Sequence, residues 1–427
     1  TKKFFLCDTM DESVLDKLKI LAESAKYDVS CASSGTSRGH KAGAIGSAAG
    51  WGICHSFAED GRCISLVKIM LTNYCRYDCA YCINRRSNDI PRATLSVTEL
   101  VNLTIEFYRR NYIEGLFLSS GVVRNPDYTM ERLVRIVKDL RTIHRFNGYI
   151  HLKGIPGASP ELIHEAGLYA DRMSVNIEIP NEKSLQTLAP EKDFQSVFTP
   201  MRHIQQGVLE SAEERKKYRS APRFAPAGQS TQMIIGATPD SDKDILRLSS
   251  ALYQRPTMKR VYYSGFVPVN AYDNRLPQLK QPPLVRENRL YQADWLLRFY
   301  QFKVDEIVDD SYPDLDLEID PKLAWALRHP EKFPVDINRA DYELLLRIPG
   351  LGVKSAKMII VSRRYGKING SQLKKMGVVL KKAQYFITCN ELPLQTVQEL
   401  RPERVRQLLI PRKGKQEDPR QLKIIFE

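Results

Sequence analysis

The stretch ISLVKIMLTNYCRYDCAYCI, residues 64–83, joins an apolar run to three closely spaced cysteines. The run Ile64–Leu71 has the length and composition of a buried β-strand. Cys75, Cys79 and Cys82 follow it with the spacing C-x3-C-x2-C, and no other Cys or His occurs before His144. Cubane iron–sulfur clusters normally use four thiolates, so three thiolates leave one iron without a protein ligand. An open position of this kind distinguishes catalytic from structural metal sites, and the stretch therefore predicts an enzyme.

Other uses of the cysteines remain open. A structural zinc site would need a second arm of ligands, which Cys54, His55 or Cys63 would have to supply from upstream. Disulfides are disfavoured because the chain is long, has eight cysteines and begins without an apolar signal peptide, which predicts a reducing cytoplasm. Cys31, Cys54, His55 and Cys63 could also ligate a second cluster or donate a hydrogen atom, but cysteine often serves only as a small buried apolar residue.

Length and charge predict a second domain that binds nucleic acid. At 427 residues the chain is longer than the length that a single hydrophobic core usually supports. No apolar run is long enough to span a membrane. The net charge is +14, but Arg328–Glu427 alone contains 21 Lys or Arg and 10 Asp or Glu, a net of +11, which leaves +3 for residues 1–327. A basic appendage of this type is typical of nucleic-acid binding, although a solvated basic surface would have the same composition.

Strand-like and helix-like segments alternate from residue 64 onward, which is typical of parallel strands with crossover helices. The predicted strands are Ile64–Leu71, Gly115–Ser119, Gly148–Lys153, Arg172–Glu178, Gln232–Gly236 and Arg260–Val267. The predicted helices are Asp11–Ala25, Thr98–Asn111, Met130–His144, Pro160–Gly167, part of Phe194–Tyr218, Asp240–Tyr253 and Leu284–Phe302. Six such units indicate an α/β fold, a partial (β/α)6 TIM-like barrel, with an all-α C-terminal domain. The expected domains are an N-terminal helix with a Gly/Ser/Ala-rich extension (1–63), the barrel (64–303), a linker (304–334) and a basic region (335–427).

The cysteine loop resembles that of the radical S-adenosylmethionine (radical SAM) superfamily. Cys75, Cys79 and Cys82 match the three ligands of its [4Fe-4S] cluster, and Tyr81 matches an aromatic position that approaches the cofactor's adenine. The resemblance implies that S-adenosylmethionine (SAM) chelates the open iron through its methionyl amine and carboxylate. One electron from the reduced cluster then cleaves the cofactor, and the 5′-deoxyadenosyl radical abstracts a hydrogen atom from substrate. An electron donor such as flavodoxin or ferredoxin is the expected partner.

The end of the second predicted barrel strand resembles a cofactor-binding position of this superfamily. Ser119, Ser120 and Gly121 lie where a Gly-Gly-Glu-like motif often binds the methionyl amine. Val122 replaces the acidic residue of that motif, so backbone carbonyls and serine hydroxyls would have to accept the hydrogen bonds.

Three later strands provide further candidates for cofactor binding. Asn176 and Glu178 lie on one face of their strand by period-two spacing, and polar residues inside a barrel are costly unless paired. They are therefore candidates for the ribose and the amine of the cofactor. The segment 232–236 resembles the fifth-strand motif that meets adenine, and the sixth strand could add a further contact. The residues expected at adenine are Ile235, Gly236 and Tyr263.

The run RIPGLGVKSAK, residues 347–357, resembles a helix-hairpin-helix element, which binds DNA without reading its sequence. An amphipathic segment ends before Pro349, and the glycines that follow allow a tight turn with positive φ. A second helix from residue 353 would then present free N–H groups to a phosphate, with positive charge from neighbouring lysines. A degenerate second copy is expected at 373–383. The residues expected to bind nucleic acid are Pro349, Gly350, Gly352, Lys354, Ser355 and Lys357.

Together the two motifs resemble radical SAM proteins with a C-terminal helix-hairpin-helix. The combination implies a cytoplasmic enzyme without a membrane partner that modifies or repairs nucleic acid, with DNA favoured over RNA. Three alternatives remain: an RNA-modifying enzyme, an enzyme that acts on a protein or small molecule and uses the tail as a tether, and a zinc-stabilised DNA-binding protein without catalysis. The sequence identifies neither the atom attacked nor whether SAM is consumed.

Overall fold

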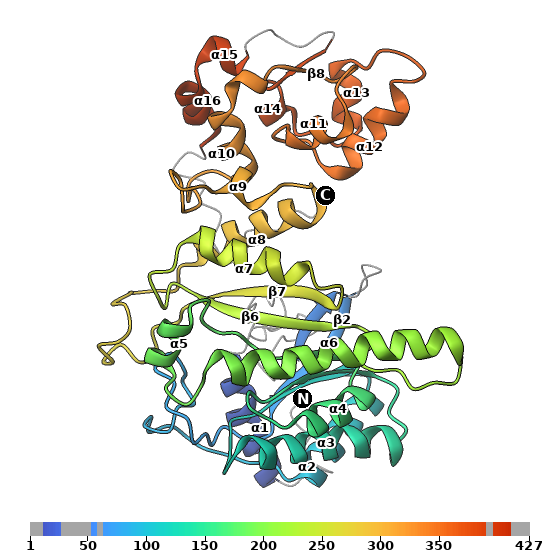
Figure 1. The fold of residues 1–427 in the computed structure, drawn as a ribbon, viewed down its shortest axis with the longest axis vertical. Helices are drawn as coiled ribbons and strands as arrows, with labels where there is room; N and C mark the ends of the chain where they lie inside the picture. The colour runs from blue at the N-terminus through green and yellow to red at the C-terminus, as the bar shows by residue number, and fades with distance from the viewer. Residues whose placement is uncertain (1–11, 27–52, 58–62, 390–395, 411–427) are drawn as a thin grey trace, which may run out of the picture. The chain divides into compact units, whose positions relative to one another are not determined.

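The computed structural model describes residues 12–26, 53–57, 63–389 and 396–410 (Figure 1). The chain forms two compact units, one of Thr1–Pro239 with Ala251–Pro282 and the other of Asp240–Ser250 with Pro283–Glu427. It therefore passes from one unit to the other three times, after residues 239, 250 and 282. The predicted Gly/Ser/Ala-rich segment and Cys31 lie outside the described residues.

A seven-stranded sheet forms the centre of the first unit (Figure 1). Its strands follow in chain order: β1 (Ile53–Phe57), β2 (Cys63–Met70), β3 (Gly115–Ser119), β4 (Tyr149–Lys153), β5 (Arg172–Ser174), β6 (Gln229–Ile235) and β7 (Met258–Gly265). The strands β2 to β7 are parallel and form a curled half-barrel, which confirms the predicted six-stranded partial barrel. The additional strand β1 pairs antiparallel with β2. Its sequence, ICHSF, has no apolar run that would predict a strand.

Helices occupy the crossovers between the parallel strands, as predicted. They are α2 (Val97–Arg109), α3 (Pro126–Thr142), α4 (Pro160–Tyr169), α5 (Glu182–Leu188) and α6 (Phe194–Lys217), and α1 (Glu12–Ala25) precedes the sheet. Side chains at the first positions explain where helices begin: Ser96 accepts from the Glu99 N–H, and Asn125 accepts from the Tyr128 N–H. The helix α6 continues for 24 residues through Pro200, so the segment predicted as helical only in part is helical almost throughout.

The strand predicted over residues 172–178 ends earlier, at Ser174. Beyond it, Glu178 has φ +66 and makes only an isolated bridge, to Met233. Its N–H donates to the Gln232 carbonyl at 2.9 Å, and its carbonyl accepts from the Ile234 N–H at 2.7 Å. A left-handed conformation costs ~1–3 kcal/mol for a non-glycine residue, so these two bonds help to hold it.

The second unit is mainly helical. It contains the first part of α7 (Asp242–Tyr253), then α8 (Leu284–Phe299), α9 (Val304–Ile307), α10 (Pro321–Arg328), a 3-10 turn (Pro330–Lys332), α11 (Tyr342–Arg347), α12 (Val353–Ser362), α13 (Gly370–Lys375), α14 (Leu380–Ala383), α15 (Val397–Leu400) and α16 (Pro402–Leu409). Two departures from expectation are visible. The strands β8 (Val335–Asp336) and β9 (Ile387–Thr388) pair in parallel, so the region is not all-α. The segment 304–334, predicted as a linker, is folded because its apolar residues are buried: Ile307 and Trp325 are each 2% exposed.

Two helical hairpins of the second unit, α11–α12 and α13–α14, contact each other through their turns. Gly350 (φ +80) lies in the first turn and Gly377 (φ +85) in the second. The Val379 N–H donates to the Gly350 carbonyl, and the Ser355 hydroxyl donates to the Met376 carbonyl, both at 2.8 Å. Each turn is therefore held in shape by the other.

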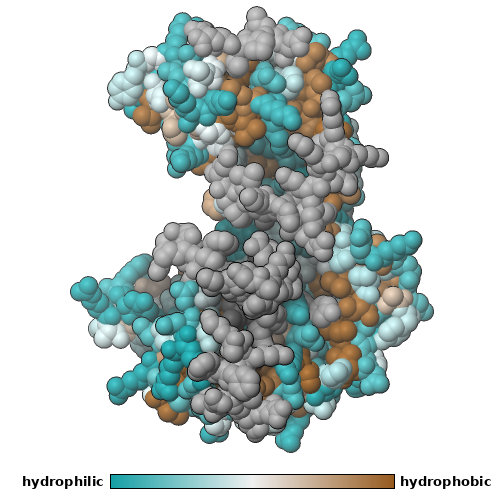
Figure 2. All heavy atoms as spheres, turned by 180° about the vertical axis from the view of Figure 1, so that it is seen from behind, coloured by the Kyte–Doolittle hydropathy of each residue, from teal (hydrophilic) through white to brown (hydrophobic). Residues whose placement is uncertain are grey.

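The surface combines polar and apolar side chains. Figure 2 shows hydrophilic and hydrophobic residues interspersed on one face of the molecule. Within the part of the chain that the structure describes, we find no helix with the length and apolar character needed to span a membrane.

Candidate functional site

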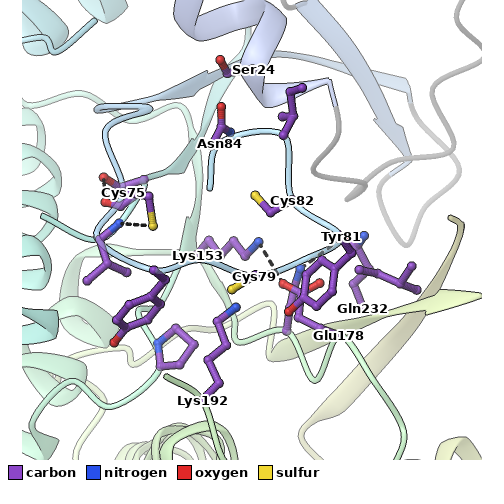
Figure 3. Close-up of a pocket in the computed structure, with 18 of the residues that line it drawn as sticks. Ser24, Cys75, Cys79, Tyr81, Cys82, Asn84, Lys153, Glu178, Lys192 and Gln232 are labelled. Carbon is purple, nitrogen blue, oxygen red and sulfur yellow. Dashed lines mark hydrogen bonds and ion pairs between the residues drawn. The ribbon is translucent and has the colours of Figure 1, made fainter. Parts of the chain in front are cut away.

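A pocket lies at the carboxyl ends of the parallel strands in the first unit (Figure 3). The loop that follows β2 lines one part of it, and residues at or after the ends of β3, β4, β5, β6 and β7 line most of the rest. Side chains from distant parts of the chain meet here because parallel strands end at the same edge of a sheet.

The three cysteines of the loop all line this pocket. The Val122 N–H donates to Cys75 Sγ at 3.4 Å, and the Cys82 N–H donates to the Cys79 carbonyl at 3.0 Å. Burial raises the pKa of the Cys79 thiol, and it raises that of Cys82 to about 12, with a smaller contribution from the neighbouring thiolates. The two thiols therefore need a strong positive charge, such as bound iron, before they can serve as thiolate ligands.

Polar side chains hold the cysteine loop in this shape. The Arg92 guanidinium donates to four carbonyls of the loop at 2.5–2.9 Å, those of Asn73, Asn84, Arg85 and Asn88. This single side chain ties the residues that precede the cysteines to those that follow them, so the backbone of the loop is preorganised.

The segment after β7 supports the same loop. The Asn270 amide donates to the carbonyls of Ala80 and Cys82 at 2.7 and 3.0 Å. The buried Arg85 guanidinium contacts Asp273 at 2.6 Å. Arg275 and Arg85 together hold the pKa of Asp273 well below its usual range, against the opposing effect of burial. Sequence analysis missed this support, since no pattern links the loop with a segment almost 200 residues later.

The arrangement of the thiols fits an iron–sulfur cluster. In a cubane cluster each cysteine binds a different iron, whereas a tetrahedral zinc ion needs its ligands to meet at one point. Within the described ranges, no group of three or more His, Cys, Asp or Glu side chains converges in a way that could hold a single metal ion. Three thiols that line one pocket are the donor type that a cluster uses.

Polar side chains also line this pocket. The Asn176 amide donates to Gln232 Oε1 at 3.1 Å, and the Lys153 ammonium lies 3.8 Å from the Glu178 carboxylate (Figure 3). All four of these side chains line the pocket. The left-handed backbone of Glu178 is a local strain of the type that occurs at functional sites. Asn176 and Glu178, which the period-two spacing placed on one face, thus both line the pocket, and Lys153 lines it as well.

Lys192 is a pocket residue that the sequence did not indicate. It comes from the turn between α5 and α6, extends toward Cys79, and its ammonium lies 5.9 Å from the centre of the Tyr81 ring (Figure 3). Burial acts to lower its pKa, but Cys79, Tyr81 and Glu178 raise that pKa well above the usual value. The raised pKa favours the charged ammonium form of Lys192 beside the cysteines.

The structure separates the three residues predicted after β3. Ser120 and Gly121 line the pocket, whereas Ser119 is 1% exposed and its hydroxyl has no hydrogen-bond partner among the residues that the structure describes. A Cβ at Gly121 would lie 2.4 Å from the Tyr74 carbonyl oxygen. Glycine is thus required at this position because the segment packs directly against the cysteine loop.

Two of the residues predicted at adenine lie one position away from residues that line the pocket. Ile235 and Tyr263 are fully buried outside the pocket, and their neighbours Ile234 and Ser264 line it instead. Successive residues of a strand face opposite sides of the sheet, so an error of one position exchanges the two faces. Gly236 has φ +85 and also lies outside the pocket lining, whereas the predicted Tyr81 lies within it.

The upstream candidates for a second cluster have no described side chains. Cys54 and His55 lie on β1 and Cys63 begins β2, and of these three residues the structure describes only the backbone. Their proposed roles therefore stay predictions.

Comparison with known proteins identifies a domain around this site. Residues 69–218, which include Cys75, Cys79 and Cys82, match the family model described as the radical SAM superfamily. A comparison with curated proteins gave no match.

Among solved structures, the chain is similar to HydG, a maturase of the [FeFe]-hydrogenase, with 16% identity, a TM-score of 0.31, and coverage of 45% of our chain and 50% of HydG. It is similar to methylornithine synthase (PylB) with 16% identity, a TM-score of 0.39, and coverage of 54% and 61%. It is also similar to coproporphyrinogen III oxidase (HemN) from Escherichia coli, a radical SAM enzyme, with 15% identity, a TM-score of 0.33, and coverage of 60% and 56%. The alignments thus span less than two thirds of each of these proteins.

Proposed function

Because the chain contains a radical SAM domain, we propose that it is a radical SAM enzyme that modifies or repairs a nucleic acid, with DNA favoured over RNA. Members of this superfamily use a [4Fe-4S] cluster and SAM. The observation that carries the enzymatic part is the pocket itself, in which three cysteine thiols and several polar side chains lie together at the strand ends.

The residues of the pocket fit both cofactors. Cys75, Cys79 and Cys82 would hold the cluster, and the Glu178 carboxylate would accept hydrogen bonds from the methionyl amine. Lys192 would compensate the negative charge of the thiolates. When bound, the reduced cluster and SAM supply a 5′-deoxyadenosyl radical, and the buried walls of the pocket exclude water from it.

The charge of the second unit supports a nucleic-acid target. Residues 344–390 contain ten Lys or Arg and no Asp or Glu. Both helical hairpins, apart from the start of α11, lie within this acid-free segment. The side chains of Lys354 and Lys357 on α12 are exposed. A cluster of positive charge of this kind attracts a polyanion without reading its sequence.

The first hairpin also offers free backbone donors. Asp341 caps α11 and Asn369 caps α13 through side-chain hydrogen bonds, but among the residues that the structure describes, no side chain caps α12, which begins after Gly352. Its first N–H groups are therefore available to a phosphate oxygen, and the helix dipole favours that negative charge. The positive φ of Gly350 supports the predicted helix-hairpin-helix turn.

The cofactor assignment is tested by anaerobic reconstitution with iron and sulfide. The wild-type chain should bind ~4 iron atoms and produce 5′-deoxyadenosine from SAM with a reductant, while a Cys75→Ala/Cys79→Ala/Cys82→Ala variant should do neither. Zinc binding without 5′-deoxyadenosine production by the wild type would show that the chain is a different class of protein.

The target is tested by the salt dependence of oligonucleotide binding. Replacing Lys354 and Lys357 by Gln should weaken binding and lower the slope of log K against log salt by ~2, since each phosphate contact contributes ~0.9 for duplex DNA. Lys216 and Lys217 on α6 offer a matched control pair in the first unit, where the same replacements should leave the slope unchanged. Tighter binding of structured RNA than of DNA at the same salt would redirect the proposal to RNA. No binding of either would favour a protein or small-molecule substrate.

A further inference from the structure

A positively charged surface next to the cysteine loop is made of residues that lie outside the pocket lining. We call it the arginine patch and define it by Tyr74, Arg76, Arg124, Tyr128 and Arg132. Tyr74 is 52% exposed, and Arg76 and Arg124 are exposed as well. These residues come from the cysteine loop and from the segment that connects β3 with α3 and begins α3.

The backbone of Val122 connects the patch with the thiol of Cys75. The Val122 N–H donates to Cys75 Sγ at 3.4 Å, and the Val122 carbonyl accepts from the Arg76 N–H at 2.8 Å. The Arg76 guanidinium in turn donates to the Arg124 carbonyl. Arg76 therefore follows the predicted ligand Cys75 directly in the sequence. Arg124 lies two residues after Val122, whose N–H contacts the Cys75 thiol.

The arginines are held in position rather than left free to move. Arg124 has φ +57, a left-handed conformation that is unfavourable for a residue with a side chain. Its guanidinium lies 4.5 Å from the centre of the Tyr128 ring, and that of Arg132 lies 5.9 Å from the same ring. Arg132 also donates to the Leu95 carbonyl at 3.2 Å.

Acidic residues near the patch do not cancel its charge. Asp127 is half-buried and accepts from the Ser159 N–H at 2.7 Å, so it is directed toward its own chain. Glu131 is exposed on α3. Counted over residues 74–76 and 122–132, three arginines and two carboxylates leave a net charge of +1 beside the cysteine loop.

We propose that the arginine patch is the docking surface of an acidic one-electron donor protein. Reduction of the cluster consumes one electron, which the donor loses, and no atom is transferred. Carboxylates on the donor would be attracted to the patch over a long range, which mainly increases the rate of association. The inference rests on the proposed cluster site and is independent of the nucleic-acid target, for which the acid-free segment of the second unit offers a separate surface.

The test uses the full chain and flavodoxin as the acidic probe. An Arg76→Glu/Arg124→Glu variant reverses two charges of the patch. The matched control is Arg109→Glu/Arg145→Glu, because both of these arginines are exposed at the amino ends of the strands and Arg145 also has a positive φ, +49. Two quantities are measured: the affinity for oxidised flavodoxin, with and without the cluster, and the rate at which reduced flavodoxin bleaches the cluster absorbance.

At low salt, the patch variant should bind flavodoxin at least ~10-fold more weakly and be reduced correspondingly more slowly, since steering contributes factors of ~10 to 10³. The control should behave as the wild type, and dithionite, which needs no docking, should reduce all three proteins at equal rates. A patch variant that loads no cluster is still informative, because its affinity for flavodoxin is compared with that of the cluster-free wild type.

Three results would overturn the inference. One is an unchanged flavodoxin affinity of the patch variant. Another is an equal loss in the control, which would indicate a nonspecific effect of net charge. The third is a loss of oligonucleotide binding with normal flavodoxin binding, which would make the patch a nucleic-acid surface. Failure of the cluster site itself is distinguishable, since the wild type would then bind no iron.

Discussion

The stability of the second unit should depend on pH through one buried lysine. Lys322 on α10 is 8% exposed, and its ammonium donates to the Leu351 carbonyl, in the turn before α12, at 2.6 Å. Burial lowers its pKa from 10.5 to about 7, although the nearby Asp320 opposes this change. In the unfolded chain the lysine recovers a pKa of ~10.4, so between pH 7 and pH 10 the unfolded state binds more protons than the folded state.

The sign and size of the effect follow from this difference. Because the folded pKa is lowered, the free energy of unfolding should rise as pH increases from about 7 and should level off above ~10. A difference of ~3.5 units corresponds to ~5 kcal/mol at most. Because the folded lysine is still half protonated at pH 7, ~2 kcal/mol of this is expected between pH 7 and pH 9. With m values of ~1–3 kcal/mol/M, the urea midpoint should increase by ~1 M over that range.

Urea unfolding followed by tryptophan fluorescence measures this increase. A Trp51→Phe background leaves Trp295 and Trp325, both in the second unit, as reporters. In that background, Lys322→Met should remove the pH dependence. The control Lys357→Met deletes an exposed lysine of the same unit and should retain it.

One outcome would refute the reasoning. The Lys322 ammonium also lies 4.7 Å from the centre of the Tyr300 ring, a contact that favours the charged form. If the wild type and Lys322→Met show the same slope, the ring and the Leu351 carbonyl keep the lysine protonated in the folded state, and burial does not dominate.

Other substitutions have clear expected outcomes. A Cβ at Gly121 would lie 2.4 Å from a carbonyl oxygen of the cysteine loop, so Gly121→Ala should reduce the iron content after reconstitution, whereas Gly366→Ala, with no atom within 4 Å, should not. Gly350→Ala places a side chain at φ +80 and 2.7 Å from a carbonyl oxygen, and should lower the unfolding free energy of the second unit by ~1–3 kcal/mol in the same urea assay. Arg85→Met leaves the buried Asp273 carboxylate without this partner, and should cost ~3–5 kcal/mol in thermal or urea unfolding of the first unit. A loss below ~1 kcal/mol would show that Arg275 alone satisfies that carboxylate.

A strand could be predicted to the residue where its buried apolar residues and its paired backbone end at the same position. Gly115–Ser119 agrees with β3 to the residue because every position of that strand is buried. The prediction for residues 172–178 extended too far because the period-two pattern continues beyond Ser174, where the left-handed Glu178 leaves the ladder. Periodicity records which side chains are buried, and it does not record where the backbone stops pairing.

The site was predictable only in part, for a similar reason. The cysteine spacing identified one wall, because its residues are close together in the sequence. Lys192 was missed since it belongs to a turn whose direction depends on the packing of α5 and α6. Asn270 and Asp273 were missed since they reach the loop from the end of the sheet. Ile235 was predicted at the site, whereas Ile234 lines the pocket, because a sequence gives the two faces of a strand without saying which one faces the pocket.

Because the chain crosses between the two units three times, the units cannot be separated by a single cut in the sequence. The segment Asp240–Ser250 belongs to the second unit, although it precedes the last residues of the first. Its Asp242 accepts from Arg286 at 2.7 Å and from the Leu315 N–H at 2.9 Å, and its Lys243 pairs with Asp310. A fragment that ends at Pro282 would retain this segment without these partners. Separate expression of the catalytic unit therefore calls for replacement of Asp240–Ser250 by a short connection, and a simple C-terminal truncation is expected to give an aggregating product.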